Sequence, residues 1–115
     1  MSNEAAQDAA ELLRVLADPT RLSMLATLRA AAQPVCICDF LASYGLSQPT
    51  ISHHMGKLRR AGLVTARKDG IWIYYEATAP LPPLVEAVLA TVTDDAVLRG
   101  RRQTGTNADP FDARP

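Results

Sequence analysis

Apolar residues recur at helical spacing near the start of the chain. Those at positions 9, 12, 13 and 16 lie on one stripe, which predicts a helix over residues 5–17. Asp18 then fits the N-cap of a second helix, and Pro19 fits its first position. In this second helix a leucine recurs at every third residue from Leu22 to Leu28. The pattern therefore predicts two successive amphipathic helices.

Two further helices are expected next, with a short glycine-containing turn between them. Residues 38–44 form a short predicted helix, and Gly45 ends it because a residue without a Cβ tolerates the left-handed conformation. Ser47 fits the N-cap of the following helix, which runs to about residue 61 and stops at Gly62. Two helices joined in this way form a helix-turn-helix.

The pattern then changes to that of β-strands. Residues 63–68 and 71–76 are rich in residues that favour strands, and Asp69-Gly70 between them is a favoured filler of a two-residue hairpin turn. A last apolar helix is predicted over residues 81–93. The expected fold class is mainly α with a small β-hairpin, a winged helix-turn-helix with the element order ααααββα.

The length of 115 residues suits one domain. We expect a folded unit over residues 1–95 and a polar, disordered tail over residues 96–115. No run approaches 18 consecutive apolar residues, so no membrane span is expected. The first residues lack the basic and apolar run of a secretion signal, and the use of two cysteines favours the reducing cytoplasm.

Positive charge is concentrated in one part of a chain whose formal net charge is zero. Between residues 47 and 75 there are five basic side chains and one acidic side chain, Asp69. The basic residues are Lys57, Arg59, Arg60, Arg67 and Lys68. A basic face of this kind is an electrostatic footprint for phosphates. The alternative interpretation is an ordinary solvated helix face.

The second helix of the helix-turn-helix has the composition of a DNA-reading helix. At 100° per residue, Ile51, Met55 and Leu58 share its inner side, which leaves hydroxyl, amide, imidazole and cationic groups outside. We expect its first turn to reach bases or nearby phosphates, and its later cations and the hairpin to reach phosphates. The predicted DNA-binding residues are Ser47, Gln48, Thr50, Ser52, His53, Lys57, Arg60, Arg67 and Lys68. The adjacent His53 and His54 point about 100° apart on a helix, so we do not expect them to share a metal ion.

These segments resemble the ArsR/SmtB family of repressors. The resemblance rests on Leu-Ala-Asp-Pro-Thr-Arg-Leu at residues 16–22, Leu-Ser-Gln-Pro-Thr-Ile-Ser-His-His at residues 46–54 and Leu-Arg-Arg-Ala-Gly-Leu-Val at residues 58–64. It covers about residues 10–92 and implies a winged-helix homodimer, paired through its first and last helices, that represses transcription from double-stranded operator DNA with an inverted repeat. It also implies that an inducing metal or metalloid ion releases the repressor.

The chain has two cysteines, Cys36 and Cys38, and they lie just before the helix-turn-helix. Their segment resembles the arsenite-binding box Cys-Val-Cys-Asp-Leu-Cys of ArsR repressors, whose third thiol falls on Leu41 here. The resemblance, and the preference of thiolates for soft ions, imply As(III) or Sb(III) as the inducer. Trivalent arsenic prefers three thiolates, and this chain supplies two. A small thiol or hydroxide could serve as the third ligand, or the ion could form a distorted complex with two thiols. A third possibility is that the inducer is an organoarsenical, which needs only two thiolates. The family's zinc site on the last helix is not expected, because that helix lacks His and Cys.

The spacing of the two cysteines constrains their geometry. If both were helical, their side chains would point about 200° apart and the sulfurs could not hold one atom. Ligand binding would then require a helix that starts after Cys38, or one whose first turn unwinds. Either arrangement couples the ion to the helix-turn-helix, so we expect the ion and the operator to weaken each other's binding.

Other interpretations remain open at this point. The cysteines could be small buried hydrophobic residues, or a Cys-x-Cys disulfide could make the protein a thiol-redox-sensing repressor. An enzyme is not expected, because a thiol reductase needs an activated thiolate, often in Cys-x-x-Cys, and Asp39 disfavours the thiolate. A winged helix that binds protein is disfavoured by the polar outer face, since interface cores favour aromatic residues. The leading prediction is a metalloid-responsive transcriptional repressor.

Overall fold

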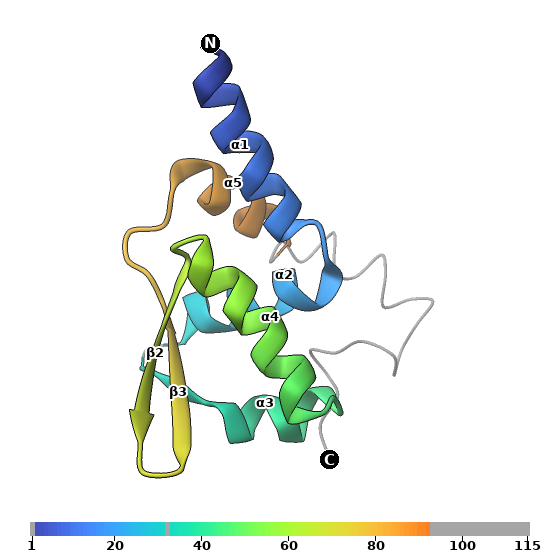
Figure 1. Ribbon diagram of the computed structural model, residues 1–115, viewed down its shortest axis with the longest axis vertical. Coiled ribbons are helices and arrows are strands. Elements are labelled where there is room, and N and C mark those ends of the chain that lie inside the picture. The colour runs from blue at the N-terminus through green and yellow to red at the C-terminus, as the bar shows by residue number, and fades with distance from the viewer. Residues whose placement is uncertain (1, 32, 93–115) are drawn as a thin grey trace.

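Five helices and three strands make up residues 2–31 and 33–92, the part of the chain that the computed structural model describes. The elements are α1 (Asn3–Leu16), α2 (Pro19–Ala30), β1 (Val35–Cys36), α3 (Ile37–Tyr44), α4 (Gln48–Arg60), β2 (Val64–Asp69), β3 (Trp72–Ala77) and α5 (Pro83–Val92). Figure 1 shows α4 crossing the front of the molecule, the hairpin β2–β3 projecting beside it, and α1 extending away from the rest. This is the expected winged helix-turn-helix.

Capping residues set the helix boundaries. Asp18 accepts two backbone N–H bonds from the first turn of α2, at 2.8 and 3.0 Å. Ser47 accepts the N–H of Thr50 at 3.3 Å and caps α4. Gly45 follows α3 at φ +66°, a left-handed conformation that a side chain would strain. All three boundaries agree with the sequence pattern, because each depends on one or two adjacent residues.

A third strand, which the sequence pattern did not predict, extends the hairpin into an antiparallel sheet of order β1-β3-β2. Val35 pairs with Tyr75, and Cys36 pairs with Tyr74. Two residues are too few to show a strand period, so β1 has no local signal. It forms because the edge of β3 offers backbone donors and acceptors to a neighbouring chain segment.

The hairpin turn lies one residue later than predicted. Asp69 pairs with Trp72, so the two-residue loop is Gly70-Ile71 and not Asp69-Gly70. Gly70 has φ +66°, which supplies the positive φ that such a turn requires. Both strands accordingly begin one residue later than expected.

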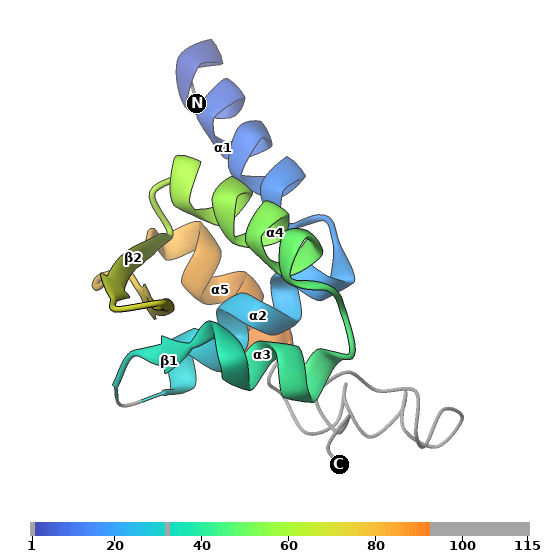
Figure 2. The same ribbon diagram turned by 60° about the horizontal axis from the view of Figure 1, so that its bottom comes forward.

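The core lies where α2, α3 and α4 meet the sheet, with α5 packed on α2, and Figure 2 shows α2 between α3, α4 and α5. The side chains at 0% exposure are Met24, Leu25, Ile51, Met55, Leu58, Leu63 and Val85. The inner face predicted for α4 is therefore confirmed. Of the α2 leucines, Leu25 and Leu28 are buried and Leu22 is half-buried.

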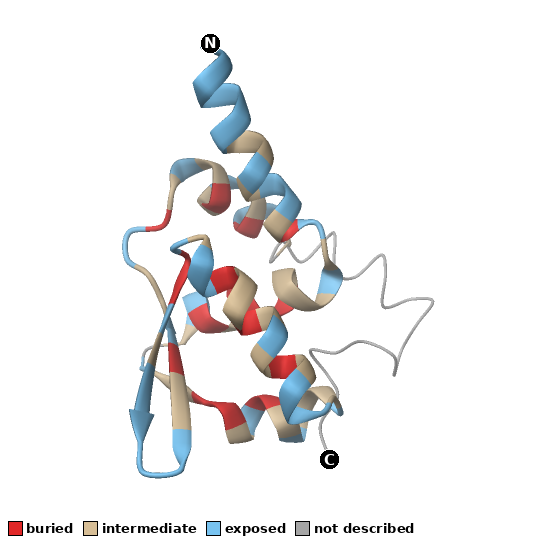
Figure 3. Ribbon diagram, in the orientation of Figure 1, coloured by how far each residue is buried: buried red, intermediate tan, exposed pale blue. Residues whose placement is uncertain are grey.

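Most of α1 is exposed (Figure 3), although its last residue, Leu16, is buried. Leu13 on the predicted stripe is 46% exposed. Ala9 and Leu12 are half-buried, so within the described residues Leu13 is the exposed member of that stripe.

Some expectations concern residues 93–115, which lie outside the described residues. They include the end of the predicted last helix, the boundary between residues 95 and 96, and the polar tail. Among the helices that are described, none combines the length and the hydropathy that crossing a membrane requires.

Candidate functional site

The residues predicted to contact DNA lie on two neighbouring elements, α4 and the hairpin. Burial of Ile51, Met55 and Leu58 fixes which side of α4 faces outward. The exposed members of the set are Ser47, Gln48, His53, Arg60, Arg67 and Lys68, and the half-buried ones are Thr50, Ser52 and Lys57. The outward side of α4 therefore carries hydrogen-bonding and cationic groups of the kinds that bind the bases and phosphates of a DNA duplex.

All three hydroxyl-bearing members of the set also have neighbours within the protein. Ser47 caps α4 and lies 2.9 Å, Oγ to Oγ1, from Thr50. Burial raises the pKa of Tyr75 on β3, and hydrogen bonding from Ser52 and the charge of Arg59 oppose that rise. Ser52 thus lies close to the hairpin as well as on α4.

The two adjacent histidines have different surroundings, as their helical spacing predicts. Their rings lie edge to face with centroids 5.8 Å apart, and His53 is exposed. The Nδ1 of His54 lies 3.3 Å from a guanidinium nitrogen of Arg21. Burial lowers the pKa of His54; the charge of Asp18 opposes this and the charge of Arg21 adds to it. Within the described residues, no three His, Cys, Asp or Glu side chains are grouped to hold a metal ion.

Arg21 is a structural residue that the sequence pattern did not single out. Its Nε donates a 2.6 Å hydrogen bond to the carbonyl of Val15 on α1, and its guanidinium lies 3.8 Å from the carboxylate of Asp18. Burial raises the pKa of Asp18, but the backbone N–H bonds from Arg21 and Thr20 and the charges of Arg21 and His54 together leave that pKa lowered. Arg21 therefore joins α1, the start of α2 and α4, a link that only the tertiary structure reveals.

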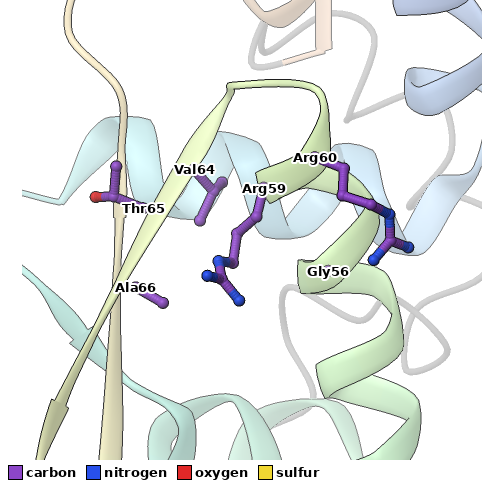
Figure 4. A pocket seen from close by; sticks show the side chains of 6 residues that line it. All are labelled: Gly56, Arg59, Arg60, Val64, Thr65 and Ala66. Carbon is purple, nitrogen blue, oxygen red and sulfur yellow. The ribbon is translucent and has the colours of Figure 1, made fainter.

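A groove of about 450 Å³ separates the end of α4 from β2 (Figure 4). Its lining residues are Gly56, Arg59, Arg60, Val64, Thr65 and Ala66. Arg59 extends into the space between α4 and β2, whereas Arg60 runs along the other side of the helix past Gly56. The sequence prediction did not include Arg59 in the DNA-binding set. Its guanidinium nevertheless adds positive charge between α4 and the hairpin.

The hairpin carries its own cations and an apolar tip. Arg67 and Lys68 are exposed on β2, and the guanidinium carbon of Arg67 lies 5.8 Å from the ring centroid of Tyr74. At the tip, Ile71 is 83% exposed and Trp72 is 44% exposed. The hairpin therefore projects a charged edge and two large apolar side chains into solvent.

The thiol pair lies where β1 becomes α3. Cys36 is the last residue of β1 and also the N-cap of α3, and its Sγ accepts the backbone N–H of Cys38 at 3.1 Å. The two sulfurs are joined as a disulfide. Cys36 is only 6% exposed, and Cys38 is half-buried.

This geometry changes the premise of one expectation. Ion binding was expected to require a helix that starts after Cys38, or an unwound first turn, if both cysteines were helical. Cys36 precedes α3, which begins at Ile37, and the two sulfurs meet with the helix intact. The reason is that an N-cap residue has extended backbone, here φ −69° and ψ 142°, so its side chain turns back over the first turn. Helical projection does not apply to Cys36. The third position of the resembled box, Leu41, is half-buried and packs on the core with carbon atoms alone.

In chemical terms, the site offers two convergent sulfur atoms at a helix N-terminus. Free thiolates there would be stabilised by the N–H of Cys38 and by the helix dipole. Two such atoms can bind a thiophilic ion jointly, or can exchange between dithiol and disulfide. Either event occurs one helix away from the outward face of α4.

Comparison with known proteins gives a consistent result. Residues 18–66 match the family model described as bacterial regulatory protein, arsR family. The arsenical resistance operon repressor of Escherichia coli K12 is 37% identical over 86 residues, which cover 75% of this chain and 69% of that protein. The arsenic resistance transcriptional regulator ArsR1 of Pseudomonas putida is 39% identical over 83 residues, covering 72% and 64%. Among solved structures, the transcriptional repressor BigR from Xylella fastidiosa aligns with a TM-score of 0.65 at 28% identity, covering 83% and 90%.

Proposed function

Because this chain belongs to the ArsR family of DNA-binding transcriptional repressors, we propose that it is the metalloid-responsive kind, released from its operator when trivalent arsenic or antimony binds Cys36 and Cys38. The family consists of transcriptional regulators and not of enzymes. The observation that carries the proposal is the meeting of the two sulfurs at the start of α3, immediately before the reading helix. The arsenic-related names of its relatives support the choice of inducer.

The donor set suits a soft ion that needs two protein ligands. Sulfur ligands prefer soft ions such as As(III) and Sb(III). With Leu41 in the third position, inorganic arsenite requires an external thiol or hydroxide, whereas a monoaryl or monomethyl arsenical already has one As–C bond and requires two thiolates. We therefore infer that organoarsenicals are bound at least as well as inorganic arsenite.

We infer that DNA is held by α4 and the hairpin of two subunits. The proposed contacts are Ser47, Gln48, Thr50, Ser52 and His53 near bases, with Lys57, Arg60, Arg67 and Lys68 on phosphates. Pairing of two copies through α1 and α5 would cover the exposed Leu13 and set the two reading helices about one DNA turn, ~34 Å, apart. An inverted repeat in the operator follows from that two-fold symmetry.

A titration of the protein on its own upstream DNA tests the proposal. Fluorescence anisotropy would follow operator release by arsenite, antimonite and phenylarsine oxide, with a phosphine reductant so that no added thiol competes for the metalloid. We expect release of the wild type, no release of Cys36→Ser or Cys38→Ser, and a coupling between ion and operator of ~1–3 kcal/mol. Tight DNA binding by the reduced wild type that ignores all three compounds would reject the metalloid as the signal.

The disulfide favours a second candidate, a repressor that senses thiol oxidation. In this case diamide would change operator affinity, the phosphine would reverse the change, and the reduced protein would ignore arsenite. The same two Cys→Ser variants would lose the response to diamide. The two candidates therefore share a sensor and differ in which reagent acts on the reduced protein.

A further inference from the structure

One row of side chains crosses the sheet from the thiol pair to the cations of the hairpin. Cys36 on β1 pairs with Tyr74 on β3, and Tyr74 pairs with Arg67 on β2. Directly paired residues of an antiparallel sheet project from the same face, with Cβ atoms about 4.5–5.5 Å apart. Tyr74 therefore lies between the proposed sensor and a proposed phosphate contact.

The aromatic ring of Tyr74 supports Arg67. The guanidinium carbon lies 5.8 Å from the ring centroid, within the range of a cation–π contact. Tyr74 is half-buried and Arg67 is exposed, so the ring forms a floor beneath the charged group. The adjacent row, Val35, Tyr75 and Ala66, projects from the opposite face, where Tyr75 is only 4% exposed. The two rows thus lie on opposite faces of the sheet, and it is the row with Tyr74 that joins Cys36 to Arg67.

The Cys36 end of the row leaves little space for an added atom. Its sulfur already accepts the N–H of Cys38 and is bonded to the second sulfur, and the residue is 6% exposed. A bound ion and its third ligand need volume that the disulfide does not occupy. The cross-strand neighbour on the same face is Tyr74, so its ring is well placed to respond to a filled site.

We propose that Tyr74 is the positioning residue that transmits the state of the Cys36–Cys38 pair to Arg67. This proposal rests on the proposed function and specifies its regulation. A ligand on the two sulfurs displaces the Tyr74 ring, the displaced ring no longer supports Arg67, and the hairpin loses a phosphate contact. The signal therefore travels along the sheet to the hairpin, and α4 need not change shape.

The test compares ring removal with ring retention. Tyr74→Thr removes the ring and keeps a residue that favours strands, Tyr74→Phe keeps the ring, and Glu76→Thr is a control on the same face of β3. For each protein, the operator Kd is measured with and without saturating phenylarsine oxide, and the ratio of the two is taken, so that a uniform change in DNA affinity cancels. We expect a ratio of about tenfold or more for the wild type, Tyr74→Phe and Glu76→Thr, and a ratio below about twofold for Tyr74→Thr.

Trp72 provides a second readout on the protein without DNA. It is the one tryptophan of the chain and lies two residues from Tyr74 on the same face of β3. Phenylarsine oxide should change Trp72 emission in the wild type and in Tyr74→Phe, and leave it unchanged in Tyr74→Thr although that variant still binds the arsenical. An undiminished Kd ratio in Tyr74→Thr overturns the transmission through Tyr74 and leaves the proposed function standing. A wild-type ratio of one overturns the proposed function and the transmission together.

Discussion

A guanidinium nitrogen of Arg21 lies 3.3 Å from the Nδ1 of His54, so the start of α2 is tied directly to the middle of α4. The same side chain donates at 2.6 Å to the carbonyl of Val15 at the end of α1. If α1 belongs to the dimer contact, Arg21 lies between that contact and the reading helix. The angle between the two helices then depends on one partly buried side chain.

Replacing Arg21 should therefore be costly. Arg21→Met removes a charged donor whose side chain is 12% exposed and leaves the Val15 carbonyl without it, so we expect a loss of ~1.5–3 kcal/mol in the free energy of unfolding by urea. Arg29→Met on the same helix is the matched control. Arg29 pairs with Glu86 at 2.6 Å but is 50% exposed, so its loss should cost well under ~1 kcal/mol. Equal losses in the two variants would contradict the role given to Arg21.

The free energy of unfolding should decrease as the pH is lowered, in part because of His54. Its pKa is below the ordinary value of 6.5 because burial disfavours the charged ring, so the unfolded chain takes up the proton first. This contribution is fully present above pH ~6.5 and is lost as the pH falls from there toward the lowered pKa. The free energy of unfolding by urea should decrease less between pH 7.5 and pH 5.5 in His54→Asn than in the wild type. His54→Asn retaining the whole wild-type decrease would assign the effect to other groups.

Substitution of alanine for glycine should raise the stability of the protein at one position and lower it at another. Gly56 lies inside α4, and an added Cβ would meet the flexible end of Arg60 at 3.4 Å, so Gly56→Ala should stabilise the protein by ~0.5–1 kcal/mol. Gly62 has φ +78°, so Gly62→Ala should destabilise it by ~1–2 kcal/mol although nothing obstructs the Cβ. Thermal unfolding of both variants measures this, and a melting temperature that falls in Gly56→Ala would show that the groove needs the glycine.

Residues that contact phosphates and residues that contact bases should differ in how their substitution changes the salt dependence of operator binding. Lys68→Gln and Arg67→Gln should each lower the slope of log Kd against log salt concentration by about 1. His53→Ala should change the preference at one base pair and leave the slope nearly unchanged. Arg59→Gln tests the groove between α4 and β2 in the same way, with Arg29→Gln as a cation distant from α4. A slope unaffected by all of the hairpin substitutions would remove the hairpin from the DNA interface.

A third thiol should change the choice of inducer. Leu41 lies three residues after Cys38 on α3, a spacing that brings side chains to one helix face. Leu41→Cys should lower the arsenite concentration for half-release by roughly tenfold or more, equivalent to ~1.4 kcal/mol, and leave phenylarsine oxide nearly unaffected. Leu41→Ser is the control, because serine is similar in volume to cysteine but has no soft donor atom. If Leu41→Cys lowered the concentration for half-release equally for both arsenicals, the leucine would limit access to the site, and the number of thiol ligands would not be the cause.

Much of this fold is readable from the sequence because its boundaries are local. Asp18, Ser47 and Gly45 each define a helix end through a cap or a left-handed turn within a few residues. The inner face of α4 follows from helical periodicity alone. These signals need no knowledge of the rest of the chain.

The features that the sequence did not reveal depend on distant partners. β1 exists through the open edge of β3, some 38 residues later in the chain as Cys36 and Tyr74 pair. The hairpin turn lies one residue beyond the expected dipeptide because pairing extends to Asp69 and Trp72. Arg21 and Arg59 acquire their roles from α4 and β2, and Cys36 from its double position at a strand end and an N-cap.

The double position of Cys36 also has a consequence for its replacement by serine. The N-cap needs a side chain that accepts the Cys38 N–H, and the oxygen of serine serves that need as well as sulfur does. Under the proposed function, exchange of Cys36 for serine would therefore remove the response to the metalloid while the cap of α3 is kept. The atom that would bind the signal and the atom that caps the helix are then one and the same, and only the cap can be supplied equally well by oxygen.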